Sequence, residues 1–472
     1  MHSILRHGSK SCNGWITIQR LNYIRTKTEN HYSVSIPEFY KGKSIFITGG
    51  TGSIGKLIIE KLLYSCPDIE KIFMLMRADS EEHAKKRIQT MIADSSFNRL
   101  NKGKVEPKLV PVVGSLGSPD LGIHTRDLEQ ITNEASIIIH LAATLSFNEP
   151  LKHAMSCNVN GTEDVLRIAR KLKNIEALVH VSTAYCVADK ENNDVEETVY
   201  KVPNVKSVIA NINNTLEKCK DRNIDSDLLG GATNTYVFSK HLAESLVAEE
   251  SENLPVAIVR PTMVSCCLKE PAEGFLNCIS AHSLVFYYIG NVTPILYSRR
   301  KNIQDFIPAD YVCNLIIVAA ANAARSKGLV VYNSASSSNN PLIFEEMTSI
   351  ARSYFNKPLR PNLFFTDSKL VWYTVMYLLR VMPAYFVDAW NKILGRQSRQ
   401  VRSQKNLMGA LIKTNYFYRN SWIFKNDNVL TIYRSLSDED KKIFPCDPSD
   451  IAWKEYLTMY IQNIAKMLKD KI

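Results

Sequence analysis

Cysteine pairs at the spacing of a zinc site or a redox motif are missing from this sequence of 472 residues. Its ten cysteines are scattered along the chain, and only Cys266 and Cys267 are adjacent. This scatter argues against a disulfide framework and against a metal centre. We therefore expect free thiols, a reducing compartment and no bound metal.

The N-terminal segment has few acidic and few apolar residues. No acid precedes Glu29, and the first 28 residues lack the apolar core of about 7–15 residues that a secretory signal needs. We expect an unstructured basic leader over residues 1–35, with a transit peptide as the alternative. The end of the chain matches no retrieval, peroxisomal or prenylation motif.

Blocks of lysine and arginine with interleaved aromatic residues are also absent, although the formal charge is +11. The charge favours an anionic partner, either a phospholipid surface or a phosphorylated small molecule, and the missing blocks argue against nucleic acid. Hydrophobic residues make up 45% of the chain, which is typical of a globular protein. The length allows about two or three domains.

The stretch around which the chain is organised is rich in glycine. The short apolar run Ile45–Ile47 leads into a TGxxGxxG pattern, and apolar residues at helical spacing follow. This order predicts a strand, a tight turn and a helix, the first half of a βαβ nucleotide-binding unit whose helix amides would bind a pyrophosphate. The cofactor-binding residues expected in the turn are Thr48, Gly49, Thr51, Gly52, Ser53, Ile54 and Gly55.

Two other interpretations of this stretch stay open. Residues Gly50–Lys56 match the first seven positions of a P-loop, but Leu57 stands where a P-loop has Ser or Thr for magnesium. A chance glycine-rich turn is the second alternative.

Further strand-like runs alternate with helical patterns along the chain, and each is apolar on both sides, as a strand covered by helices on both faces must be. They are Lys71–Met76, Leu109–Val113, Ser136–Leu141, Ala177–Val181 and Val256–Val259. The alternation predicts an α/β fold with a doubly wound parallel (Rossmann-type) sheet over residues 36–340. Aromatic-rich helical patterns from 341 to 472 predict a smaller, mainly helical C-terminal domain.

Arg77 ends the second predicted strand, at the place where an NAD-binding protein usually carries an acid for the ribose 2′-hydroxyl. A guanidinium there fits a 2′-phosphate and favours NADPH. Asp79, two residues on, keeps NADH as the alternative.

Two stretches carry residues suited to chemistry. Ser182 and Thr183 follow the strand Ala177–Val181, at the carboxyl edge of the sheet where ligands of such folds bind. Tyr236 and Lys240 are four residues apart on a predicted helix and so share a face. An ammonium beside a phenol would lower the pKa of the tyrosine, which could then deliver a proton to a carbonyl oxygen.

The segment Leu370–Trp390 is long enough to cross a bilayer of about 30 Å. Because Arg380, Pro383 and Asp388 interrupt it, a helical hairpin lying in a membrane interface and simple buried helices are equally good interpretations.

Together these motifs resemble the extended short-chain dehydrogenase/reductases and, more narrowly, the insect-type alcohol-forming fatty acyl-CoA reductases. The resemblance runs from about residue 36 to the end of the chain. It also rests on Ile36–Tyr40, His140–Thr144, Asn158–Thr162, Val181–Cys186, Arg260–Thr262, Phe306–Asp310, Asn426–Val429 and Asp450–Tyr456.

The resemblance implies reduction of a long-chain or very-long-chain fatty acyl-CoA to a primary alcohol, with two NADPH and a bound aldehyde. Such alcohols are precursors of waxes and ether lipids. It also implies a membrane-associated protein, in the endoplasmic reticulum first and the peroxisome second, and leaves a homo-oligomer open.

The resemblance further implies roles for single residues. Tyr236 would be the acid, and Lys240 would tune it and hold the nicotinamide ribose. Thr183, with Ser182 less favoured, would bind the carbonyl oxygen, and Asn158 would hold a proton-relay water. The remaining cofactor contacts would be Ala142 and Ala143 on the adenine side and Pro261 and Thr262 under the nicotinamide. The acyl pocket is expected near Gly274–Cys278.

Rival interpretations remain at this point. Cys186 could be acylated as a nucleophile. The chain could instead be an extended dehydrogenase acting on a sterol or a nucleotide sugar, or an inactive NADP-binding scaffold at a membrane. Ser53, Ser115 and Ser146 depart from the residues common in the family, and this bears on substrate choice and activity.

Overall fold

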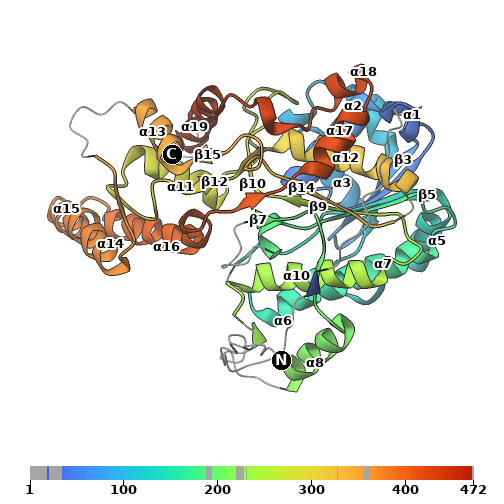
Figure 1. The fold of residues 1–472 in the computed structure, drawn as a ribbon, viewed down its shortest axis with the longest axis horizontal. Coiled ribbons are helices and arrows are strands. Elements are labelled where there is room, and N and C mark those ends of the chain that lie inside the picture. Colours follow the sequence, from blue (N-terminus) through green and yellow to red (C-terminus); the bar gives the residue numbers. More distant parts are fainter. Residues whose placement is uncertain are drawn as a thin grey trace, which may run out of the picture.

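A seven-stranded parallel sheet forms the centre of the protein (Figure 1). The computed structural model describes residues 34–147, 149–187, 194–218, 228–229, 231–326, 328–355 and 362–469, and the backbone of 19–20; most of the predicted leader lies outside them. The strand order is β14-β9-β6-β5-β2-β3-β4. Their bounds are β2 (Ser44–Thr48), β3 (Lys71–Met76), β4 (Leu109–Val113), β5 (Ala135–His140), β6 (Ala177–Val181), β9 (Val256–Pro261) and β14 (Val330–Ser334).

The predicted doubly wound sheet is confirmed, and every predicted strand lies in it. The sequence interpretation missed β14, at the edge beside β9. From β2 the chain extends the sheet one way through β3 and β4 and the other way through β5 and β6. The point between β2 and β5 is therefore the switch point, where ligands bind at the carboxyl ends of the strands.

Alternate residues of each strand build two separate cores. Ile45 and Ile47 face α2 (Ser53–Ser65) and α12 (Ala309–Ser326), whereas Phe46 faces the layer of α7 (Gly161–Lys171) and α10 (Thr235–Glu250). Figure 1 shows these two layers on opposite faces of the sheet. Successive strand side chains point to opposite faces, which explains why each predicted strand is apolar throughout.

A helical region follows the sheet and lies at the left of Figure 1. It gathers helices from two parts of the chain: α11 (Ala281–Asn291), α13 (Phe344–Phe355), α14 (Lys369–Met376), α15 (Met382–Ile393), α16 (Gln400–Arg419) and α19 (Trp453–Lys469). Phe286 of α11 stacks on Tyr460 of α19, with ring centroids 5.4 Å apart. The helical C-terminal region expected from the sequence is thus present, with α11 added from the middle of the chain.

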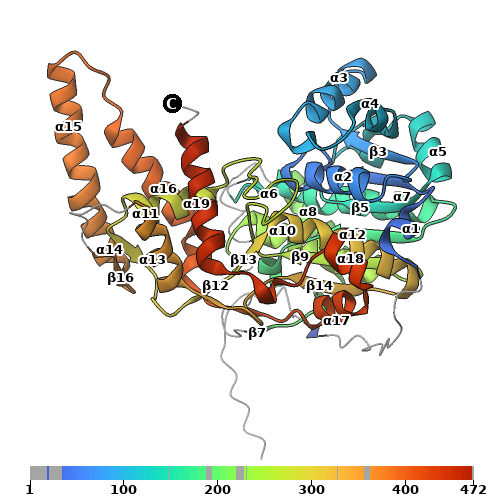
Figure 2. The same cartoon turned by 90° about the horizontal axis from the view of Figure 1, so that it is seen from above.

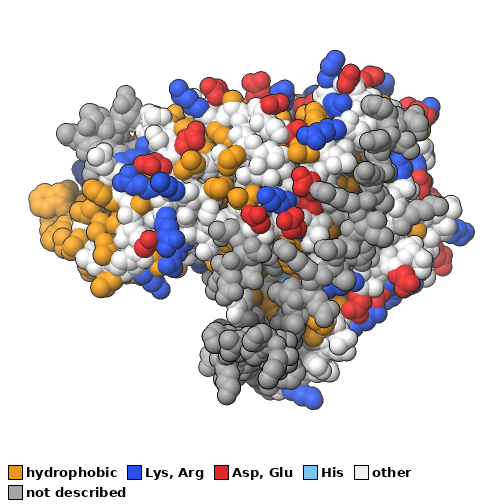
Figure 3. Space-filling model, in the orientation of Figure 1, with side chains coloured by type: hydrophobic (Ala, Val, Ile, Leu, Met, Phe, Trp, Pro, Cys, Tyr) orange, Lys and Arg blue, Asp and Glu red, His pale blue; other side chains and the backbone are white. Residues whose placement is uncertain are grey.

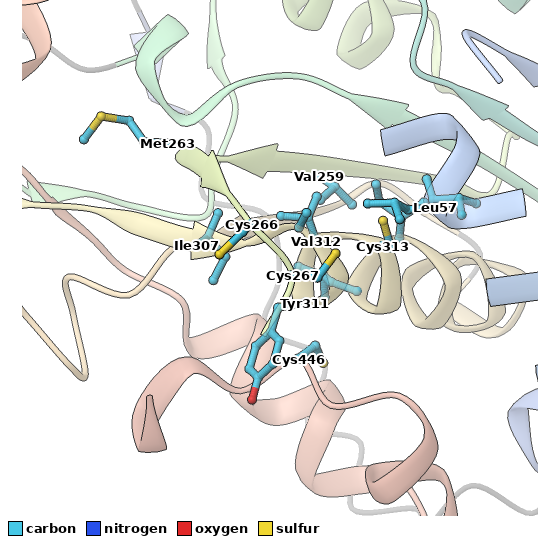
Figure 4. Close-up of a cluster of buried hydrophobic side chains, with 14 of the residues drawn as sticks. Leu57, Val259, Met263, Cys266, Cys267, Ile307, Tyr311, Val312, Cys313 and Cys446 are labelled. Carbon is cyan, nitrogen blue, oxygen red and sulfur yellow. The ribbon is translucent and has the colours of Figure 1, made fainter. Parts of the chain in front are cut away.

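The chain then returns to the sheet through α17 (Asp427–Ser435) and α18 (Asp438–Ile443), which Figure 2 shows beside α12 and β14. Asn314 of α12 donates a hydrogen bond to the Pro445 carbonyl (2.8 Å). In Figure 4, Cys446 lies next to Tyr311 of α12, and Cys266, Cys267 and Cys313 fill the same apolar cluster as free thiols. The division at residue 340 remains a prediction, since these contacts cross it.

The apolar segment predicted at Leu370–Trp390 is one helix arm, Lys369–Ile393, with a π-helical turn at Tyr377–Val381. It is long and apolar enough to span a membrane, and only 22% of its most apolar 18-residue stretch is buried. The interpretation as simple buried helices is therefore wrong. With α16 the arm forms a hairpin that projects from the molecule (Figure 2).

Candidate active site

The glycine turn lies where β2 passes into α2. Gly49 has φ +76°, and a Cβ on it would lie 2.8 Å from the Ala142 backbone nitrogen. A Cβ on Gly55 would lie 2.2 Å from the Gly49 carbonyl oxygen, so only glycine fits at both positions. Within the described part of the chain, no side chain caps the start of α2 at Gly52. The first amides of the helix therefore point unpaired to the switch point, as a pyrophosphate site requires.

The P-loop interpretation fails on the lysine that it needs. Lys56 pairs with Asp94 (3.2 Å) instead of reaching back over the turn. Thr48 is tied to the opposite strand, since its Oγ1 accepts a hydrogen bond from the Ala142 nitrogen (3.2 Å) and bonds His140 Nδ1 (2.6 Å). These bonds hold the glycine turn against the end of β5, just before Ala142 and Ala143.

The predicted pair of hydroxyls is divided between two faces. The Thr183 side chain lies beside the phenol of Tyr236 and lowers its pKa, against the larger effect of burial, which raises it. Ser182 Oγ instead lies 3.4 Å from Cys186 Sγ, near the Glu244 carboxylate, whose pKa it lowers. The geometry therefore favours Thr183 over Ser182 as a substrate contact.

Tyr236 and Lys240 lie on α10, whose N-terminus is capped by Asn234 Oδ1 accepting from the Val237 nitrogen (2.9 Å). Lys240 Nζ donates to the Val181 carbonyl at the end of β6 (2.7 Å). Burial raises the pKa of Tyr236 above its ordinary value, and burial lowers the pKa of Lys240 to about 8. The lowered pKa expected for Tyr236 is therefore wrong for this structure, because the buried ammonium is bonded to a backbone carbonyl.

A buried ion pair beneath these residues escaped the sequence interpretation. Arg260 at the end of β9 donates from Nε to Glu244 Oε2 of α10 (3.0 Å), and both side chains are fully buried. Arg260 also donates to the Thr198 carbonyl (2.7 Å). The sequence contained one signal for this pair: Glu244 lies four residues beyond Lys240 and therefore on the same face of α10. The pair fixes α10 against the sheet.

Cys186 lies beside this ion pair, with its Sγ 3.4 Å from Glu244 Oε2. Burial and the neighbouring carboxylate raise the pKa of the Cys186 thiol to about 12. Because the thiolate is the nucleophile, this environment disfavours acylation of Cys186.

Asn158 is fully engaged by protein groups. It lies in a π-helical turn at Met155–Asn160, where its Nδ2 donates to Ser239 Oγ of α10 (2.9 Å) and to the Thr144 carbonyl (3.2 Å). Its Oδ1 accepts from the Thr144 nitrogen (2.8 Å). Asn158 thus positions the loop after β5 against α10, and its role in holding a water stays a prediction.

Pro261 and Thr262 end β9 at the same edge of the sheet. Thr262 Oγ1 donates to the buried Asp305 (2.7 Å), which also accepts from the Ser336 and Ser337 nitrogens (2.9 and 2.8 Å). Asp305, which the sequence interpretation did not single out, therefore anchors the loops after β9 and β14.

Aromatic side chains cover the site from the helical region. The rings of Phe147 and Tyr236 are 5.9 Å apart, and Phe417 of α16 lies 5.4 Å from Phe147. Phe417 also contacts Tyr185 (4.7 Å) and His282 (5.4 Å). The catalytic edge is thus closed by residues far away in the sequence.

Arg77 is exposed just beyond β3, so its guanidinium is free to face a ligand at this end of the site. Asp79 points into solvent and pairs with His83 (3.3 Å). The two side chains that could bind the ribose, Arg77 and Asp79, are therefore both on the surface. Asp79 is paired with His83 of α3 (Glu81–Ile92).

Comparisons with known proteins agree with this geometry. Two family models, both described as male sterility protein, match residues 47–316, as an NAD-binding part, and residues 379–470. Fatty acyl-CoA reductase 1 of Mus musculus is 33% identical over 448 residues, covering 92% of this chain and 86% of its own. A putative fatty acyl-CoA reductase of Drosophila melanogaster is 33% identical over 456 residues, covering 92% and 88%.

Solved structures share the fold at lower identity. The terminal R domain from the myxalamid PKS-NRPS pathway has a TM-score of 0.63 at 19% identity, covering 90% of this chain and 91% of its own. A reductase domain of a nonribosomal peptide synthetase from Mycobacterium tuberculosis has a TM-score of 0.62 at 20% identity, covering 93% and 94%. With the glycine turn, the NAD-binding family match and the relatives at 33% identity, the chain belongs to the fatty acyl-CoA reductase family of oxidoreductases.

Proposed function

We propose that this protein reduces long-chain or very-long-chain fatty acyl-CoA to primary alcohol with NADPH. The observation that carries the proposal is that Thr183 lies beside the Tyr236 phenol at the carboxyl edge of the sheet, the same edge at which the glycine turn follows β2. Family membership supplies the substrate class, and the neutral aromatic lid of Phe147 and Phe417 suits an uncharged acyl group.

The two hydroxyls have complementary tasks. A bound NADPH would supply one hydride to the thioester carbon, after which the CoA thiolate would leave, and a second NADPH would supply a hydride to the carbon of the bound aldehyde. Thr183 would donate a hydrogen bond to the oxygen on which negative charge develops. Tyr236 would donate the proton that this oxygen takes up. No enzyme nucleophile is required.

The decisive test is Tyr236→Phe, followed by gas chromatography of the products. Alcohol formation should fall by about 10²–10⁴-fold, since one positioned acid contributes that much. NADPH should still raise the melting temperature, because the glycine turn is untouched. Tyr64→Phe, at an exposed tyrosine, is the matched control. Undiminished turnover of Tyr236→Phe would refute the role, and NADPH binding without any turnover of the wild type would favour the inactive scaffold.

We propose NADPH as the preferred cofactor because Arg77 follows β3, where a ribose 2′-phosphate would lie. Asp79 is engaged with His83 rather than aimed at the site. A guanidinium binds a phosphate with two charge-assisted hydrogen bonds, which NADH cannot accept there.

We also propose that the protein binds a phospholipid surface, in the endoplasmic reticulum first and the peroxisome second. The support is an apolar surface, here called the outer hairpin face and seen as the orange left end of Figure 3. Its exposed side chains are Leu370, Val371, Tyr377, Leu378, Leu379, Met382, Tyr385, Phe386, Val387, Trp390, Ile393 and Leu394.

The charges of the hairpin fit this partner. Arg380 donates to Gln404 (3.2 Å), and Asp388 accepts from the Gln400 and Val401 nitrogens (2.9 Å each), so these two charged side chains of the apolar arm turn toward α16. Between Asp388 and Lys413 the chain has no acid, and its bases would meet anionic lipid. They are Lys392, Arg396, Arg399, Arg402 and Lys405.

Flotation with vesicles that contain phosphatidylserine tests this proposal. The wild type should float, and a double change of Phe386 and Trp390 to Glu should stay in the soluble fraction. Ile343→Glu, at an exposed apolar residue outside the hairpin, is the control and should float. If the double variant floats equally well, the outer hairpin face is not the membrane contact. Protease protection of tagged termini in microsomes and peroxisomes then gives the compartment.

A further inference from the structure

A cavity of about 610 Å³ lies between α11, α14 and α16, apart from the catalytic edge. Its volume falls in the range of roughly 300–1,000 Å³ that is usual for small-molecule sites. Its floor is made of buried apolar side chains. They are Val285, Ile289, Leu296, Phe344, Trp372 and Leu411.

The cavity adjoins the catalytic edge through aromatic side chains. Tyr416 and Tyr418 line it, and Phe417 between them points to Phe147, the ring that contacts Tyr236. His282 packs on Phe417, and burial lowers the pKa of this histidine to about 4, so it is uncharged at neutral pH. The partition between cavity and catalytic edge thus carries no charge from these residues.

The mouth of the cavity has the opposite character. Lys369 and Arg419 are exposed around it, together with Arg299, which pairs with Asp367 (3.1 Å). Ile412 beside them is 45% exposed. Leu370, the first residue of the outer hairpin face, directly follows Lys369 and is 77% exposed. A mouth that is cationic and borders an apolar surface is suited to the headgroup level of a bilayer.

We propose that this cavity receives the distal part of the fatty acyl chain while the thioester lies at Tyr236. The chain passes beside the contact of Phe147 with Phe417, and its methyl end rests on the apolar floor. This inference rests on the proposed function and adds to it the element that limits chain length. Leu411 is the residue that contacts the methyl end of the acyl chain. It lies on the cavity floor, one helical turn from Leu407.

The expected acyl pocket at Gly274–Cys278 is not part of this cavity. Cys278 Sγ lies 3.2 Å from Ser53 Oγ at the start of α2, and a Cβ on Gly274 would lie 2.3 Å from Asn463 of α19. That segment therefore packs between the glycine turn and α19. Among the described residues it supplies no wall of the cavity.

The test compares Leu411→Phe with Leu407→Phe. Both residues are buried on α16, one turn apart, and only Leu411 lines the cavity. Leu411→Phe should lower kcat/KM for a very-long-chain acyl-CoA relative to palmitoyl-CoA by about tenfold or more, because an apolar pocket discriminates by this factor over small size changes. Leu407→Phe should leave the ratio unchanged. An unchanged ratio in both variants, with both folded, overturns the proposal.

A binding measurement separates this proposal from the proposed function. Trp372 is 4% exposed and forms part of the floor. An acyl-CoA brominated near its methyl end should quench its fluorescence, and Trp372→Phe should remove that quenching. Quenching without turnover of any acyl-CoA would leave the cavity assignment standing and refute the proposed function. Turnover without quenching of Trp372 fluorescence would refute the cavity assignment. This outcome decides the question even if Leu411→Phe does not fold.

Discussion

The exposed side chain of Arg77 is expected to set the preference for NADPH over NADH. It is exposed beyond β3, and its backbone carbonyl accepts a hydrogen bond from Arg87. We expect Arg77→Ser to weaken NADPH binding by about 10–100-fold, the value of a lost hydrogen bond to a charged group, with NADH binding unchanged. Fluorescence titration of both cofactors measures this. Equal losses for both would show that Arg77 does not contact a 2′-phosphate, and Arg126→Ser, at an exposed arginine of α5 (Thr125–Glu134), is the control.

His180 predicts a pH dependence of stability. Its ring lies 5.3 Å from that of His140, and neither of its nitrogens has a hydrogen-bond partner among the described residues. Burial holds the pKa of His180 well below its ordinary value of about 6.5, so the folded state keeps it neutral. The unfolded state binds a proton below that pH, so the free energy of unfolding falls as pH drops, by about 1.4 kcal/mol per pH unit for this group.

We therefore expect His180→Leu to reduce the loss of stability between pH 7 and pH 5, measured by denaturant unfolding at both values. His83→Leu, on the surface of α3, controls for removal of an imidazole. An unchanged pH dependence in His180→Leu would show that another group governs acid sensitivity. His140, whose pKa burial lowers to about 3, would then be the next candidate.

At the scale of one element, the hairpin depends on Asp388. Its two carboxylate oxygens accept from the Gln400 and Val401 nitrogens, which are the first amides of α16. Asp388→Ala should destabilise the start of α16 by about 1 kcal/mol, the usual value of a lost cap. Hydrogen exchange of residues 400–404 should speed up about fivefold, while α19 keeps its protection. Unchanged exchange in α16 would mean that Arg380 and packing alone hold the hairpin.

Elements differ in how well their sequences predicted them. The strands ending at Met76 and Val113 were placed to the residue because both faces are apolar, and a helix was expected at Tyr236 and Lys240 because they are four residues apart. The strand β14 was missed because Val330–Ser334 is short and polar at its end. The π-helical turn at Met155–Asn160 was also missed, since the local pattern there is that of an ordinary helix.

At the scale of the whole molecule, the sheet and the C-terminal helices share one core. Ser265 bonds the Tyr456 phenol (2.5 Å), Ser283 bonds the Tyr460 phenol (2.8 Å), and α18 accepts from the Ile36 nitrogen through Asp440 (3.1 Å). A fragment of residues 36–340 would expose these buried surfaces. We expect it to aggregate even in detergent micelles, whereas residues 34–472 should stay monodisperse in the same detergent, which covers the outer hairpin face, and bind NADPH.

Expression of both fragments and size-exclusion chromatography check this. A soluble, monomeric 36–340 fragment whose melting temperature rises with NADPH would show that residue 340 is a true domain boundary. Aggregation of the longer fragment would instead assign a folding role to the first 33 residues.

Local patterns in the sequence determined the sheet, the glycine turn and the helix that presents Tyr236 and Lys240, because strand and helix periodicities act over a few residues. Only the tertiary structure decided which groups face each other: Thr183 rather than Ser182 at the phenol, and Phe417 of a distant helix over Phe147. It also decided that the arm Lys369–Ile393 turns Arg380 and Asp388 toward α16 and its apolar side outward. The physical reason is that such partners are selected by packing between elements far apart in the chain, which no local spacing encodes.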